Sequence, residues 1–173
     1  MELFIDFLKI ILPATLVLYA MYLTFTSFLN KDFEKKVLEL RTKNSDIILP
    51  IRLQAYERII LFLERITPNN LIIRVNNPSY SSKEFQQILL KEIREEFNHN
   101  LSQQVYVSDK SWILVRKAVE DLAIVINNAS KEVSNEASGL DLTKKIFETI
   151  MQQNTDITSE AISFVKKEIQ QTF

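Results

Sequence analysis

The sequence predicts an all-α protein in which an N-terminal transmembrane helix precedes a small helical bundle. Three observations support this class: a run of 20 residues without a charge near the start, apolar residues that recur every three or four positions afterwards, and a helix-capping signal at Ser81. With 173 residues, the chain has room for one domain beside such an anchor.

The charge-free run is Ile10–Leu29, and as a helix it rises about 30 Å, the thickness of the hydrocarbon core of a bilayer. A cleaved signal peptide and a buried core helix are the alternatives. A signal peptide needs a basic start and small residues at its cleavage site, whereas this chain starts with Glu2 and Asp6 and the run ends in large residues. A core helix would show a polar face, which the run lacks. We therefore expect an uncleaved anchor in the lipid bilayer.

Basic residues beside a span are retained on the cytoplasmic side of a membrane. Lys9 alone precedes the run. The basic residues that follow it are Lys31, Lys35, Lys36, Arg41 and Lys43. We therefore expect the amino terminus outside the cell and the remainder of the chain in the cytoplasm. The predicted organisation is a transmembrane anchor over residues 1–30, a juxtamembrane helix and linker over 31–49, and a cytoplasmic helical bundle over 50–173.

Beyond the anchor, the pattern predicts helix almost throughout. Phe33, Val37 and Leu40 extend the membrane helix outward by one or two turns. Pro50 is expected to open a new helix in its first turn, where a missing N–H costs nothing, and this helix should end near Ile66.

A short apolar run, Leu71–Val75, lies between Pro68 and Pro78. Taken alone, the run fits either a strand or a helix. Because the chain offers no obvious partner strand, we interpret it as a buried turn of helix.

The next predicted helix begins at a capping box, in which Ser81 pairs with Glu84. A four-residue stride of apolar side chains marks its buried face. These residues are Phe85, Leu89, Ile93, Phe97 and Leu101.

Another helix is expected to start after Ser108. Its apolar positions alternate steps of three and four: Trp112, Val115, Val119, Leu122, Ile126, Ala129 and Val133. Such a seam is typical of supercoiled helices. Because Ala118, Ala123 and Val125 widen the stripe, the pattern favours the central helix of a bundle over a coiled-coil dimer.

Two shorter helices complete the predicted bundle, Leu140–Gln152 and Ile157–Gln171. The second is expected to bury Ala161, Ile162, Val165 and Ile169. Gly139, the only glycine, is placed in the link between helices, where its backbone freedom would end one helix and orient the next.

The composition excludes several classes of function. One glycine cannot form a P-loop or a dinucleotide-binding turn. The lack of cysteine removes thiol chemistry and thiolate metal sites, and a single histidine argues against a histidine-based site. From Lys31 onward, 20 basic residues balance 20 acidic ones, so the surface has no electrostatic footprint for nucleic acid. We expect no cofactor and no enzymatic activity.

The segment 50–66 carries the most informative surface. Its polar face contains Gln54, Glu57 and Arg58, and Leu61 lies in the middle of that face. An apolar residue centred on a polar stripe reduces solubility and indicates a contact with a partner. His99 falls about 200° around its helix from the seam, on the outer face, where catalysis or metal binding is not expected. The predicted partner contacts are Gln54, Glu57, Arg58, Leu61 and His99.

Three phrases of the sequence carry a resemblance: PIRLQAYERIILFLERITP, FNHNLSQQVYVSDKSW and ASGLDLTKKIFE. With them, nearly the whole chain resembles a family of single-span membrane proteins of Bacteroidetes bacteria that contain a domain of unknown function. The resemblance implies an anchored helical protein of the bacterial inner membrane. It implies no activity, and it assigns no residue a role.

Two functional hypotheses follow. The first is a membrane-anchored, non-enzymatic adaptor or accessory subunit of an inner-membrane protein complex, which tethers a protein partner. The second is a ligand-binding sensor or enzyme with a polar pocket inside the bundle, lined by carboxylates and by Arg52, Arg58, Arg65 and Arg74. A homo-oligomer formed through the membrane helix is also compatible with the sequence, although no small-xxx-small glycine motif supports it.

Overall fold

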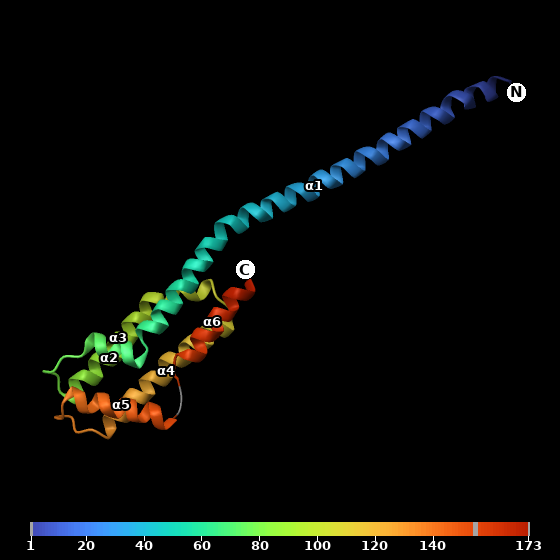
Figure 1. Cartoon of the computed structure of the whole chain (residues 1–173). Helices are drawn as coiled ribbons and strands as arrows, with labels where there is room; N and C mark the ends of the chain where they lie inside the picture. Colours follow the sequence, from blue (N-terminus) through green and yellow to red (C-terminus); the bar gives the residue numbers. More distant parts are fainter. Residues whose placement is uncertain (1, 154–155, 173) are drawn as a thin grey trace. The chain divides into compact units, whose positions relative to one another are not determined.

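The computed structural model describes residues 2–153 and 156–172, and every regular element within them is helical (Figure 1). The elements are α1 (Glu2–Arg65), α2 (Pro68–Val75), α3 (Ser82–Asn100), the 3-10 helix η1 (Leu101–Val105), α4 (Asp109–Lys131), α5 (Gly139–Gln153) and α6 (Ser159–Thr172). No β-strand occurs in these two ranges, where the β-type pairing is an isolated bridge between Ser81 and Ser138. The predicted all-α class is confirmed.

The chain divides into two compact units, unit 1 (Met1–Leu49) and unit 2 (Pro50–Phe173). In unit 1, the helical segment Ile11–Leu40 is long and apolar enough to cross a membrane, with a mean hydropathy of 1.5. None of it is buried, and large side chains such as Leu18 are 65% exposed. A single-pass membrane protein is compatible with this finding.

The threonines of the apolar segment bond to their own helix. Thr15 donates its hydroxyl to the carbonyl of Leu12 at 3.0 Å, and Thr24 donates to the carbonyl of Ala20 at 2.8 Å. A hydroxyl that is satisfied in this way costs less in an apolar environment than one without a partner.

Pro50 does not begin a helix, so this prediction was wrong. Instead, α1 is helical from Glu2 through Pro50 to Arg65, and residues 31–49 are helical throughout. A proline inside a helix removes the hydrogen bond to the carbonyl four residues earlier, here that of Asp46, and crowds that carbonyl, but the helix can continue on both sides. Proline favours a first turn but does not require one.

The core of unit 2 is apolar and is built around α4, which packs on α3, α5 and α6 (Figure 1). Its largest fully buried side chains are Tyr56, Ile59, Phe62, Leu63, Ile66, Leu71, Phe85, Leu89, Leu122, Ile126, Leu142 and Ile146. Helix α6 adds Ala161 and Val165, and Ile162 and Ile169 pack partly buried against them, as predicted. The central position of α4 confirms the bundle interpretation of its seam.

The face of α3 is confirmed except at its end. Phe85, Leu89 and Ile93 are buried, and Phe97 stacks on Trp112 with ring centroids 5.6 Å apart. Leu101 is 42% exposed, because α3 ends at Asn100 and the chain continues as a 3-10 turn. The tighter 3-10 helix no longer keeps a four-residue stride on one face.

The run Leu71–Val75 is helical, as interpreted from the sequence. It belongs to α2, which has Pro68 in its first turn. Leu71 and Ile72 are buried, so this short helix closes one side of the core.

Side chains cap the helix starts as predicted at two places. Ser81 and Glu84 form both bonds of the capping box of α3. Ser108 is the N-cap of α4 and accepts a hydrogen bond from the amide of Ser111 at 3.2 Å. These bonds satisfy amides that the first turn of a helix leaves without a partner.

Gly139 is not a link residue, which corrects the sequence interpretation. It is the first residue of α5, with Ser138 before it bonded to Asp141 in the same manner as a capping box. The amide of Gly139 donates to the carbonyl of Tyr80 at 3.0 Å, and a Cβ here would lie 3.4 Å from Phe85. The glycine thus serves close packing between α5 and α3.

Replacing Leu122 by alanine should lower the free energy of unfolding by about 2–5 kcal/mol, because the change leaves a cavity in a fully buried position. Thermal unfolding of the full chain in a non-ionic detergent, followed by circular dichroism, measures the effect. Ile124→Ala is the matched control, since Ile124 lies on the same helix and is 54% exposed. Equal midpoints for the two variants would contradict this description of the core.

Candidate functional site

Four of the five predicted partner contacts share one face of α1. Gln54, Glu57, Arg58 and Leu61 are all exposed, and Leu61 is 54% exposed. Their spacing of three and four residues places them on neighbouring turns. Glu57 and Arg58 make no ion pair with any residue that the structure describes, so both charges are free to meet a partner.

The fifth predicted contact, His99, lies apart from these four on α3. It is exposed, as expected, and its Nδ1 lies 3.2 Å from the carbonyl oxygen of Glu95. None of the contacts among the described residues joins His99 to the α1 face. A contact between His99 and a partner stays a prediction.

The α1 face borders a hollow of about 370 Å³ that α1 shares with η1. We define the α1–η1 surface as Ile51, Gln54, Arg58 and Leu61 of α1 with Ser102, Gln103, Val105 and Tyr106 of the η1 segment. Apolar side chains are prominent on it: Val105 is 77% exposed and Ile51 is 42% exposed. The η1 half of this surface was not predicted, because the five residues of the 3-10 helix show no regular spacing of apolar side chains.

The carboxylate of Glu168 on α6 supports this region. It accepts hydrogen bonds from the hydroxyls of Tyr56, Ser108 and Ser111, each at 2.5 Å, and from the amide of Ser108 at 3.0 Å. Burial raises the pKa of Glu168, but these hydrogen bonds outweigh burial and lower the pKa to about 2. Glu168 is therefore ionised at neutral pH and ties α6 to α1 and to the start of α4.

Arg52 extends the same network to the end of η1. Its Nε donates to the carbonyl of Tyr106 at 3.3 Å, and its Nη2 donates to the hydroxyl of Tyr56 at 3.3 Å. Burial raises the pKa of Tyr56, and so does the hydrogen bond that Tyr56 donates to Glu168. The phenol therefore stays protonated at neutral pH, as a donor to Glu168 must.

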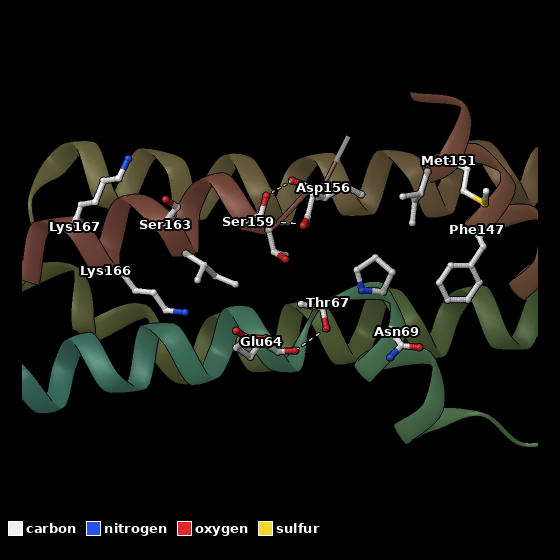
Figure 2. Close-up of a pocket in the computed structure, with 15 residues that line it drawn as sticks. Glu64, Thr67, Asn69, Phe147, Met151, Asp156, Ser159, Ser163, Lys166 and Lys167 are labelled. Atoms are coloured by element: carbon white, nitrogen blue, oxygen red, sulfur yellow. Dashed lines mark hydrogen bonds between the residues drawn. The ribbon is translucent and has the colours of Figure 1, made fainter. Parts of the chain in front are cut away.

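A second concave region is an open groove of about 810 Å³. It lies at the C-terminal end of α1, near Glu64. Figure 2 shows Glu64, Thr67 and Asn69 on one side of it and the α5 and α6 residues on the other. Its apolar lining comes chiefly from Phe147, Ile150, Met151, Ile157 and Ile162.

Several polar groups of this groove bond to helix ends. The hydroxyl of Thr67 donates to the carbonyl of Glu64 at 2.8 Å, and the amide of Ser159 donates to Asp156 Oδ1 at 3.3 Å. Lys166 and Lys167 are the cations of its lining, and Figure 2 shows their side chains pointing in different directions. The groove therefore offers an apolar wall with a charged rim and not a converging set of acid and base groups.

Of the four arginines considered for a polar pocket, Arg65 and Arg74 meet at Glu96, and Arg52 and Arg58 lie at other places. Arg65 contacts Glu96 at 2.8 Å, and Arg74 contacts Glu92 at 2.6 Å and Glu96 at 3.9 Å. Arg52 belongs to the Glu168 network, and Arg58 lies on the α1–η1 surface.

The interior of unit 2 also lacks charge, as far as the structure describes it. Its buried polar residues are Ser82, Ser111, Ser130 and Thr158, all of which carry hydroxyls. No group of three or more potential metal ligands gathers among the described residues.

These features define a helical-bundle protein whose concave surfaces are open and whose interior is apolar. The family described as "Family of unknown function (DUF7935)" matches residues 2–172, and the chain belongs to this family. The expected domain of unknown function is thereby confirmed, while the Bacteroidetes origin stays a prediction. Comparisons with curated proteins and with solved structures gave no match.

Replacing Glu168 by glutamine should lower the free energy of unfolding by about 1–3 kcal/mol at neutral pH, because three hydroxyls and an amide lose a charged acceptor. The native pKa of about 2 lies below the ordinary value of 4.5, so the carboxylate stabilises the fold above pH 4.5. This stabilisation is lost as the pH falls from 4.5 toward 2. The variant should therefore show a shallower loss of stability over that range in acid titrations followed by circular dichroism.

Glu160→Gln is the control for this experiment, since Glu160 lies on the same helix with a 64% exposed side chain and, among the described residues, bonds to Lys117 alone. It should retain both the stability and the pH profile of the unchanged protein. Identical acid profiles for the two variants would show that Glu168 does not stabilise the fold.

Proposed function

We propose that the protein is a single-span membrane protein whose helical unit 2 binds a protein partner through the α1–η1 surface. In this role it is an adaptor or accessory subunit of a complex in the bacterial inner membrane. The observation that carries the proposal is the exposed apolar helix of unit 1, none of whose segment Ile11–Leu40 is buried. Such a surface is stable only when lipid or other protein covers it.

The basic residues after the span support an amino terminus outside the cell and unit 2 in the cytoplasm. The start of the chain is acidic, with Glu2 and Asp6 beside Lys9. Five basic residues follow the span and one precedes it, and such an excess of Lys and Arg retains its flank in the cytoplasm.

The α1–η1 surface has the composition of a protein contact. Ile51, Val105 and Tyr106 are its exposed apolar side chains at the hollow, beside uncharged polar groups and Arg58, and the exposed Leu61 lies one turn farther along α1. Interfaces combine an apolar centre with a polar rim, and arginine and tyrosine are enriched in them. Arg52 and the Glu168 network hold both halves of this surface, which reduces the ordering cost of binding.

A ligand-binding sensor is the second candidate, and the groove beside α5 and α6 is the observation that favours it. Its volume of about 810 Å³ lies in the range of small-molecule sites. The apolar wall with Lys166 at its edge suits an apolar ligand that carries an anionic group.

The Leu61→Asp variant should lose a stoichiometric partner, because the change replaces an exposed apolar side chain of the contact by a charge that has to be desolvated on binding. The partner is identified by mild-detergent purification of the tagged full chain with quantitative mass spectrometry, against a control that contains residues 1–45 only. Ile124→Asp places the same charge at a similarly exposed apolar residue of α4 and should keep the partner. A folded Leu61→Asp variant that retains every partner would exclude the α1–η1 surface as the docking site.

The orientation can be tested cleanly because the chain contains no cysteine. Ser134 is exposed in the segment between α4 and α5, so a Ser134→Cys variant should react with a membrane-impermeant maleimide only after the cells are permeabilised. Labelling of intact cells would place unit 2 outside the cytoplasm and reject this part of the proposal.

A further inference from the structure

Unit 1 carries a narrow apolar line beyond the charge-free run. Its members are Phe33, Val37, Leu40 and Ile47, separated by four, three and seven residues. At 100° per residue, these positions fall within about 80° of one another on the helix. Spacing of three and four is the pattern of a coiled-coil seam, and the step of seven passes over Asn44, a polar residue at the intervening position of that pattern.

The side chains of this line are largely uncovered. Phe33, Leu40 and Ile47 are 69%, 62% and 66% exposed. A hollow of about 250 Å³ opens beside Phe33 and Val37, with Glu34 and Leu38 as its other walls.

Charges flank the line without favouring a lipid surface. Over residues 33–47 four basic residues accompany three carboxylates, so a net charge of only +1 attracts anionic headgroups weakly. Lys36 bonds to Asp32 of its own helix at 2.8 Å. The charged residues beside the line therefore neither bind the segment strongly to the membrane surface nor add a large repulsion between two copies.

We infer that this line, the 33–47 seam, binds the same seam of a second copy of the chain in a parallel pair of helices. A seam with a regular spacing of three and four is complementary to itself, and every copy carries it at the same place. The parallel orientation rests on the proposed membrane anchor, because two copies in one membrane point the same way. Phe33, Val37 and Leu40 lie at the end of the segment Ile11–Leu40, and Ile47 lies beyond it.

The seam is short, which makes the pair depend on the anchor. From Phe33 to Ile47 the helix rises about 21 Å, or two heptads, and isolated helices of this length are marginal in water. Anchoring two copies in one membrane raises their effective concentration, so a weak contact suffices. The pair should therefore form in vesicles and weaken when the protein is diluted in detergent.

Disulfide crosslinking of single-cysteine variants tests the inference in the full chain. Val37→Cys and Leu40→Cys place a thiol on the seam, and Lys35→Cys places one on the opposite side of the same helix, about 160° from Val37. In vesicles of phosphatidylcholine and phosphatidylglycerol, treatment with copper phenanthroline should give roughly tenfold more dimer for the two seam variants than for Lys35→Cys. Adding Leu40→Glu to Val37→Cys should remove this excess.

Equal crosslinking at the three positions, or none at any, would overturn the inference. Contact between the seam and lipid would also overturn the inference. A bimane label on Val37→Cys would report such contact as a blue-shifted emission from monomeric protein. Flotation of the same vesicles tests the anchor separately. If the protein does not float with the vesicles, the proposed membrane anchor is wrong. The difference in dimer yield between Val37→Cys and Lys35→Cys still tests the seam independently.

Discussion

The carboxylate of Glu168 joins three helices of unit 2, because Tyr56 of α1 and Ser108 and Ser111 at the start of α4 all donate hydrogen bonds to it. A partly buried carboxylate loses some of its hydration, and here three hydroxyls and an amide replace that hydration as hydrogen-bond donors. This network also fixes the position of η1, because α4 starts at the network and Arg52 donates a hydrogen bond to the carbonyl of Tyr106, directly after η1. The α1–η1 surface is thus a consequence of polar bonds at one end of an otherwise apolar bundle.

Most of the helices could be predicted because their signals are local. The capping box needs only Ser81 and Glu84 three residues apart, and the N-cap of α4 needs only the hydroxyl of Ser108 before an apolar period. The seam of α4 likewise repeats within one helix, so its buried face followed from the pattern. The exposed face of α1 with Leu61 could be recognised for the same reason, since burial of one side of a helix leaves the other in water.

The features that were missed depend on contacts between distant parts of the chain. Glu168 resembles any surface carboxylate of an amphipathic helix, and its side-chain donors lie 57 to 112 residues away in the sequence. Leu101 continues the stride of α3, but the change to a 3-10 helix moves it off the buried face. Pro50 has the sequence signature of a helix start, and whether a helix begins there depends on the hydrogen bonds of its neighbours, which composition does not report.

Many of the exposed apolar side chains belong to one of three settings, and each setting suits a different binding partner. In the first half of Ile11–Leu40 they surround the helix on all sides, a distribution that lipid covers. In the 33–47 seam they form one line between charges, which fits another helix of the same spacing. On the α1–η1 surface they border a hollow with a polar rim, which fits a folded protein. Under the two proposals, a pair of copies joined at the seam carries two partner sites in one membrane. Binding at both sites would then strengthen the attachment of a bivalent partner without any additional contact within either site.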